Sequence, residues 1–197
     1  MTERKHRIKI IGMILAAILL IGGIGYRLYW INACYPSPQV KTYSFNESIE
    51  AGNYSITFSD WQWGDGTNIY KMYPEYVYLT DEKGNAYPAS KMRVGILELT
   101  VTKTADDESI LALENIAFES GAWGNQFDLE LTYLMNPDLE GLRIKMKADE
   151  SRKILLPMIM NDTYFTNEQW RNIDQRKFYI VLQYYPEKLR FECPVTI

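Results

Sequence analysis

A run of sixteen residues without a single charge, Ile10–Gly25 (IIGMILAAILLIGGIG), restricts the fold of this chain more than any other feature. Residues 26–31 (YRLYWI) lengthen the run to roughly the 20 residues that a helix needs to cross the hydrocarbon core of a bilayer. Arg27 reaches the headgroups with its long side chain, and the aromatic residues beside it suit the interfacial belt. We therefore predict a transmembrane signal anchor over residues 10–31.

The charge before this run predicts its orientation. Residues 1–9 form a basic tail, and residues 1–27 hold five basic residues against Glu3, a net charge of +4. The positive-inside rule keeps such a tail in the cytoplasm and exports the rest of the chain. Residues 28–197 hold the other 16 of the 21 basic residues and the other 24 of the 25 acidic ones, a net charge of -8. This acidic balance argues against nucleic acid as a partner, because phosphate contacts need a basic face.

Two other fates of the apolar run compete with an uncleaved anchor. A cleaved signal peptide needs a small-residue site after the run, whereas Ala16-Ala17 lies inside it. Residues 31–34 (INAC) loosely fit a lipobox, which makes a lipoprotein anchored at Cys34 the alternative, although Arg27 and two aromatic residues separate the run from that cysteine. We favour the anchor, and both alternatives stay open.

Residues 32–39 contain Pro36 and Pro38, which cannot continue a helix, and are predicted to form a stalk. Residues 40–197 then show short alternating segments typical of strands, and no long amphipathic helix. We predict strands at 40–45, 54–63, 75–79, 92–102, 110–118, 127–135, 142–146, 153–159, 178–184 and 189–193. In 92–102 the expected core residues are Val94, Ile96 or Leu97, Leu99 and Val101. The predicted fold is all-β, an immunoglobulin-like antiparallel β-sandwich, with one N-terminal transmembrane helix before it.

The stretch DWQWGDG, residues 60–66, combines two tryptophans, two aspartates and a glycine turn. Apolar parity changes near Ser59-Asp60, which predicts a β-bulge and favours an indole packed in the core. The other interpretation is a binding surface at the strand end, where aromatic hot spots recognise a partner. The residues of that surface are Trp61, Trp63, Asp65, Tyr70 and Tyr73.

The exported segment lacks the residues of the common catalytic sites. The single histidine is His6, on the cytoplasmic tail, so a Ser-His-Asp triad or a histidine zinc site is not available outside. No glycine-rich phosphate loop is present. We expect no enzyme activity, no cofactor and no metal site; Asp60 and Asp65 are weak calcium candidates without a known loop spacing.

The two cysteines, Cys34 and Cys193, are a possible disulfide. Outside the cell such a pair can oxidise, and closing so long a loop contributes about 4–5 kcal/mol in the chain-entropy treatment. The alternative is a simply buried Cys193.

Three segments together resemble a known family: residues 54–66 with WQWGDG, residues 119–131 (ESGAWGNQFDLEL) and residues 181–188 (VLQYYPEK). The family consists of exported, membrane-anchored proteins of Gram-positive bacteria with an immunoglobulin-like domain of unknown function. The resemblance covers roughly residues 36–195. It implies the fold and the location, and it brings no catalytic residues.

The sequence therefore predicts a membrane-tethered extracellular domain that binds a protein, a peptide or a wall polymer. The main alternative is an accessory or sensor subunit of a membrane complex, in which the glycines of residues 12–25 allow close contact with another transmembrane helix. An enzyme is the least favoured class.

The anchor predicts the behaviour of the protein in membranes. After a carbonate wash, which strips peripheral proteins, we expect the protein in the membrane pellet at its full mass. A mature N-terminus at residue 34 would contradict the anchor and favour the lipoprotein.

Overall fold

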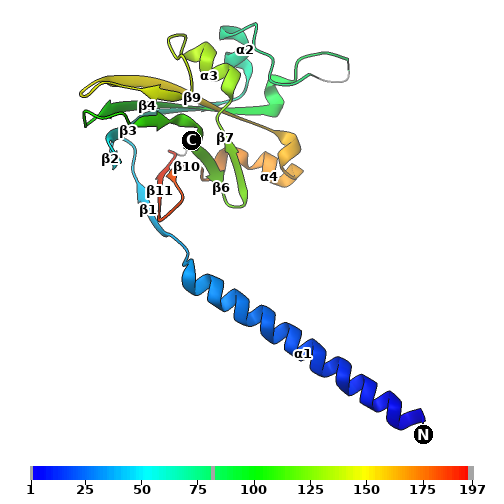
Figure 1. The fold of residues 1–197 in the computed structure, drawn as a ribbon. Coiled ribbons are helices and arrows are strands. Elements are labelled where there is room, and N and C mark those ends of the chain that lie inside the picture. Colours follow the sequence, from blue (N-terminus) through cyan, green and yellow to red (C-terminus); the bar gives the residue numbers. More distant parts are fainter. Residues whose placement is uncertain (1, 81–82, 195–197) are drawn as a thin grey trace. The chain divides into compact units, whose positions relative to one another are not determined.

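The computed structural model describes residues 2–80 and 83–194 and divides into two units, residues 1–39 and 40–197. The first unit is built on the helix α1 (Thr2–Cys34), drawn in blue in Figure 1. Its apolar part, Ile10–Cys34, has 25 residues with exposed side chains. At about 1.5 Å per residue it is long enough to cross a membrane, a property that anchors and signal sequences share. The helix includes Asn32–Cys34, which we had assigned to the stalk, because the first proline comes only at Pro36.

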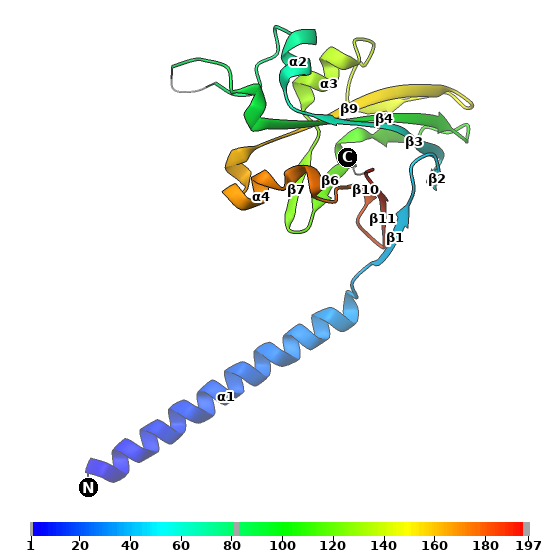
Figure 2. The same ribbon diagram turned by 180° about the vertical axis from the view of Figure 1, so that it is seen from behind.

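The second unit contains two larger sheets and one small one (Figures 1 and 2). The five-stranded sheet has the order β1 (Gln39–Tyr43), β11 (Glu187–Glu192), β10 (Tyr179–Gln183), β6 (Ala117–Ser120), β7 (Trp123–Gln126). The four-stranded sheet has the order β2 (Ser48–Ala51), β3 (Tyr54–Gly64), β4 (Met92–Lys103), β9 (Ser151–Asn161). The third sheet pairs β5 (Ile110–Ala112) with β8 (Arg143–Lys145). Short helices connect them: α2 (Thr67–Met72), α3 (Leu129–Met135) and α4 (Asn167–Arg171), with 3-10 turns at Ala89–Lys91, Leu113–Asn115, Asp162–Tyr164 and Ile173–Gln175.

The predicted antiparallel β-sandwich is confirmed. The main core lies between the two larger sheets, where Phe58 of β3 meets Phe191 of β11 edge-on with ring centroids 4.3 Å apart. The order β11-β10-β6 is that of the G, F and C strands of an immunoglobulin sheet. In the opposite sheet, β4 lies between β3 and β9 and pairs with both over nearly its whole length.

The predicted bulge in β3 is present. Phe58 pairs with Leu99 and Asp60 pairs with Glu98, which leaves Ser59 as the extra residue. Tyr54, Ile56 and Phe58 are buried before the bulge, and Trp61 after it. The extra residue therefore keeps the large side chains on the inner face although their parity changes.

The Trp61 ring lies directly over Gly95 of the neighbouring strand β4. A Cβ atom built on Gly95 would lie 2.2 Å from Cη2 of this ring. No side chain larger than hydrogen fits at that position, so the bulge and the glycine are two parts of one packing arrangement.

A second, smaller core covers the outer face of the four-stranded sheet. Val94 of β4 and Ile159 of β9 pack there with Ile69 of α2 and Leu131 of α3. The start of β4 and the end of β9 are thus buried on both faces. This explains why β9 is apolar over most of its length instead of alternating.

Three predicted strands are wrong. Residues 110–118 are not one strand: the 3-10 turn Leu113–Asn115 divides them, so that β5 pairs with β8 whereas β6 pairs with β7 and β10. Residues 127–135 form no strand; Phe127 precedes α3, whose first turn is capped by Asp128 Oδ1 accepting the N–H of Leu131 at 2.8 Å. The strand that pairs with β6 is instead Trp123–Gln126. Residues 75–79 are irregular, because Tyr76 is buried and donates its hydroxyl to Asp128 Oδ2 at 2.8 Å. In β4, Leu97 and not Ile96 reaches the main core.

The free edge of β9 is closed by side chains and loops. The Asn136 amide accepts the N–H of Leu155 at 2.9 Å and donates to its carbonyl at 2.8 Å, as a neighbouring strand would. Pro157 has no N–H to offer, and its carbonyl accepts the N–H of Asp128 at 2.7 Å. Such closure protects an apolar edge from pairing with other chains.

We expect Gly95→Ala to lower the free energy of unfolding by about 1–3 kcal/mol or more, because the added methyl overlaps the Trp61 indole. Gly64→Ala in β3 is the matched control, since nothing lies within 4 Å of its added Cβ. Thermal unfolding of both full-length variants in detergent, followed by circular dichroism, measures the difference. Equal melting temperatures would contradict the close packing at Gly95.

Candidate functional site

The two tryptophans of DWQWGDG face the interior of the sandwich. Trp61 is buried and stacks on the half-buried Trp63, with ring centroids 5.8 Å apart. Trp63 packs against Phe178 at 5.0 Å, and its Nε1 donates to Asp174 Oδ1 at 2.9 Å. This geometry favours the packing interpretation of the stretch, because both indoles pack against aromatic rings of the main core.

Asp174 also connects these rings to β4. Arg93 donates to both of its carboxylate oxygens, from Nε at 2.7 Å and from Nη2 at 3.0 Å. The same guanidinium lies 5.5 Å from the centre of the Trp170 ring of α4. The hydrogen bond from Arg93 lowers the pKa of Asp174 below its ordinary value despite burial. The segment between β9 and β10 is therefore fastened to the four-stranded sheet by a two-point ion pair.

The other residues of the predicted binding surface lie in different surroundings. Asp65 is exposed, and its Oδ1 accepts the N–H of Thr67 at the start of α2 at 2.9 Å. A shallow groove of about 180 Å³ includes Trp63 and Asp65 in its lining. Tyr70 and Tyr73 instead pack against the second core, where the hydroxyl of Tyr70 donates to the carbonyl of Tyr87 at 3.0 Å. The five predicted residues therefore do not form one surface.

The weak calcium candidates serve local structure. The carboxylate of Asp60 accepts the N–H of Trp61 at 2.9 Å and the amide of Gln62 at 3.0 Å. Asp65 begins α2, as described above. Among the described residues, no group of three or more His, Cys, Asp or Glu side chains is placed to hold a metal ion.

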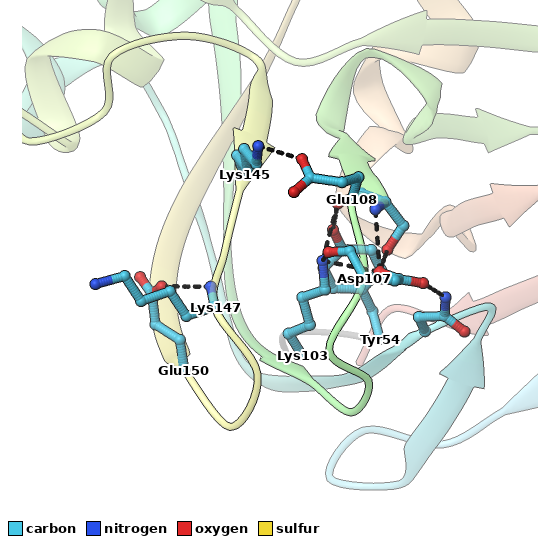
Figure 3. Close-up of polar contacts among 9 residues, drawn as sticks. Tyr54, Lys103, Asp107, Glu108, Lys145, Lys147 and Glu150 are labelled. Carbon is cyan, nitrogen blue, oxygen red and sulfur yellow. Dashed lines mark hydrogen bonds and ion pairs between the residues drawn. The ribbon is translucent and has the colours of Figure 1, made fainter.

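A lysine that we did not predict as a site residue occupies an oxygen-lined cage at the end of β4 (Figure 3). The side chain of Lys103 is fully buried. Its Nζ donates to the carbonyls of Asp107 at 2.6 Å and Ser109 at 3.1 Å, and lies 3.0 Å from Asp107 Oδ1. The Tyr54 ring lies 5.6 Å away, and its hydroxyl donates to the Ser109 carbonyl at 2.7 Å. We call Lys103, Asp107, Ser109 and Tyr54 the Lys103 cage.

The charges within the cage stabilise one another. Hydrogen bonds from the Ser109 side chain and then from Lys103 hold the pKa of Asp107 well below its ordinary value. Burial alone would lower the pKa of Lys103, but the hydrogen bond to Asp107 and the surrounding charges outweigh it and raise the pKa. Both groups are thus ionised at neutral pH. Three oxygen atoms surround the ammonium, as oxygen ligands surround a bound metal cation.

The sequence contained a signal for this residue. Leu97, Leu99 and Val101 point inward at period two, and Lys103 follows at the same parity. A lysine at that parity indicates one of two things: the strand has ended before it, or its charge is buried and has partners. We had ended the strand one residue earlier, at position 102.

The cage forms part of the wall of a groove between the two larger sheets. This inter-sheet groove has a volume of about 320 Å³ and is lined by Tyr54, Ile56, Ile110, Leu111, Ile116 and Leu182, among others. Ser109 belongs both to the lining and to the cage. The side chain of Ile110 is 53% exposed although it is apolar. The groove therefore offers apolar surface on a wall that buried hydrogen bonds hold in place.

Both cysteines of the possible disulfide are free thiols in the structure. Cys34 is exposed at the end of α1, and Cys193 is buried in the main core. Burial raises the pKa of the Cys193 thiol far above its ordinary value. Cys193 is therefore an unreactive thiol in the folded domain.

Comparison with known proteins identifies the family of this chain and assigns it no activity. A family model described as a domain of unknown function (DUF5028) matches residues 40–189. No curated protein matches the sequence. This match confirms the resemblance to a family of unknown function that the sequence indicated. The matched residues begin at position 40, so the confirmation concerns the domain and not the anchor.

Three solved structures resemble this chain at low sequence identity. A conserved hypothetical protein from Bacillus anthracis is 13% identical, with a TM-score of 0.47, over 74% of this chain and 94% of that one. A candidate lipoprotein from Bacillus subtilis is 11% identical, with a TM-score of 0.49, over 78% of this chain and 39% of that one. An uncharacterised β-sandwich protein from Clostridium difficile is 11% identical, with a TM-score of 0.43, over 80% and 96%.

Lys103→Met removes a buried ammonium that donates to the carbonyls of Asp107 and Ser109 and pairs with the Asp107 carboxylate. We expect a lower melting temperature at neutral pH. Lys153→Met is the matched control, because Lys153 is an exposed lysine paired with Glu98 on the sheet surface, where an ion pair contributes little. Equal melting temperatures for the two variants would contradict the role of the cage.

The same variant changes the response to acid. Because the folded pKa of Asp107 is depressed, its contribution is present above the ordinary Asp range and is lost as pH falls towards the folded value. Without Lys103 this depression is smaller. The melting temperature of Lys103→Met is therefore expected to fall less steeply than that of the wild type as pH is lowered below about 4.

Proposed function

Because the chain belongs to the family described as a domain of unknown function (DUF5028), we propose a function from the features of the molecule itself. It is a membrane-tethered extracellular domain that binds a protein or peptide partner in the inter-sheet groove and catalyses no reaction. The observation that carries this proposal is the exposed apolar side chain of Ile110 on the wall of that groove.

The tether rests on the N-terminal segment. Ile10–Cys34 is long and apolar enough to cross a bilayer, and the basic tail before it favours a cytoplasmic N-terminus. The sandwich then lies outside the cell. An uncleaved helix keeps the domain at the membrane, whereas a lipid on Cys34 would hold it there by another route.

The groove suits an apolar side chain of a partner. Aliphatic side chains are the largest class in its lining, beside the polar side chains of Asn53, Ser109 and Asn115. Its volume of about 320 Å³ accommodates one or two side chains of a bound chain. The Lys103 cage fixes the adjoining backbone, so little conformational freedom is lost when a partner binds. These features favour a protein or peptide over a wall polymer.

The absence of a reaction is part of the proposal. Outside the cytoplasmic tail the sequence has no histidine, and Asp107, whose pKa lies well below its ordinary value, is held by a serine and a lysine within the fold. Its hydrogen bonds serve the wall of the groove rather than a substrate.

The test is capture of a partner on intact cells with a membrane-impermeant cross-linker. The wild-type protein is compared with Ile110→Asp, which places a charge in the groove, and with Leu129→Asp. Leu129 is equally exposed on α3 and does not line the groove. We expect a defined partner with the wild type and with Leu129→Asp, and its loss with Ile110→Asp.

Two outcomes contradict the proposal. Equal capture of the partner by all three proteins would show that the groove does not bind it. Capture only with a membrane-permeant reagent places the domain in the cytoplasm. Melting temperatures of the three proteins verify that each is folded.

A further inference from the structure

The tip of the hairpin between β10 and β11 exposes two adjacent aromatic rings. Tyr184 and Tyr185 are 48% and 60% exposed, and Pro186 follows them. The Nζ of Lys188 lies 5.2 Å from the centre of the Tyr184 ring. An apolar ring with a polar hydroxyl and a nearby cation suits the headgroup region of a bilayer, where tyrosine is enriched.

This tip lies beside the start of β1. Lys41 Nζ is 2.7 Å from Glu187 Oε2, Arg190 Nε donates to Thr42 Oγ1 at 3.1 Å, and the rings of Tyr43 and Phe191 are 5.7 Å apart. Residues 41, 42 and 43 contact residues 187, 190 and 191 in that order, so β1 is parallel to β11. The first residues of β1 therefore flank the hairpin tip, as both ribbon views show (Figures 1 and 2).

The chain length between the apolar helix and β1 limits how far this part of the domain can be from a membrane. The helix ends at Cys34 and β1 begins at Gln39. Five residue steps extend at most about 17 Å. When Ile10–Cys34 spans a bilayer, the start of β1 remains within that contour length of its surface, and so does the hairpin tip beside it.

The charge around the tip differs from that of the exported chain. The segment after residue 27 has a net charge of -8, which an anionic membrane surface repels. Around the tip, Lys41 is paired with Glu187, and Lys188 and Arg190 share Glu119, so the three cations exceed the two carboxylates by one charge. Val40 adds an exposed apolar side chain. Val40, Lys41, Tyr184, Tyr185 and Lys188 form what we call the tip patch.

We propose that the tip patch rests on the phospholipid headgroups of the same bilayer that holds α1, as a second point of attachment. This inference rests on the tether of the proposed function. The helix alone leaves the domain free to tilt on a short stalk, whereas a second contact fixes its orientation. Leu182, which lines the inter-sheet groove, precedes Tyr184 by two residues. One side of the groove therefore lies close to the tip patch.

The experiment uses the full-length protein in vesicles of phosphatidylcholine and phosphatidylglycerol. Tyr185→Cys is prepared with Cys34→Ser, and an environment-sensitive fluorophore is attached at position 185. Cys193 stays unlabelled because it is buried. Met72→Cys in the same background is the control; Met72 is exposed on α2, away from the tip patch.

We expect blue-shifted emission at position 185 and its loss when a lipid carries a quencher near the headgroup. The label at position 72 is expected to respond to iodide in the water instead. Equal responses at both positions, with the protein still floating with the vesicles after a salt wash, overturn the tip contact and leave the tether intact. Protein that does not float overturns the tether and this inference with it.

Discussion

The indole of Trp61 against the backbone of Gly95 is the contact on which the rest of the sandwich depends. It requires a glycine in β4, and it requires the bulge at Ser59 that turns the ring inward. Once Trp61 is in place, Trp63 stacks on it and reaches Asp174, which in turn holds Arg93. One ring thus connects both sheets with the segment that joins β9 to β10.

β4 carries a buried or half-buried cation at each end, and each cation holds a connecting segment. Arg93, near its start, fastens Asp174. Lys103, at its end, holds the loop that contains Asp107 and Ser109. The loss of hydration on burial is large for a charge, so each cation is kept only because several oxygen atoms surround it. The central strand therefore determines the position of loops on both ends of the sandwich, including one wall of the inter-sheet groove.

Alternation in the sequence was enough to predict the sandwich and the bulge, because these depend on parity. In β4 it predicted Leu99 and Val101 correctly for the main core, whereas Val94 faces the second core on the other side of the sheet. A capping box formed by Thr166 and Gln169 starts α4. Residues 127–135 failed because Phe127, Leu129 and Leu131 alternate like a strand, while the decisive feature is a single capping carboxylate on Asp128. Residues 75–79 failed because aromatic residues favour strands in general, whereas here a tertiary hydrogen bond holds Tyr76. The inter-sheet groove lay beyond prediction, since its lining comes from segments far apart in the sequence that only the sheet order brings together.

A groove whose wall is held by buried charges differs from one that a ligand must order. The carbonyls of Asp107 and Ser109 already accept hydrogen bonds from Lys103, and that of Ser109 accepts a second one from Tyr54. What remains for recognition is the aliphatic surface around Ile110 and Leu182. Such a surface selects by shape and apolar contact rather than by hydrogen-bond pattern. With the tip patch on the headgroups, this selection takes place close to the bilayer, where a partner that is itself held by the membrane meets the groove at a high effective concentration.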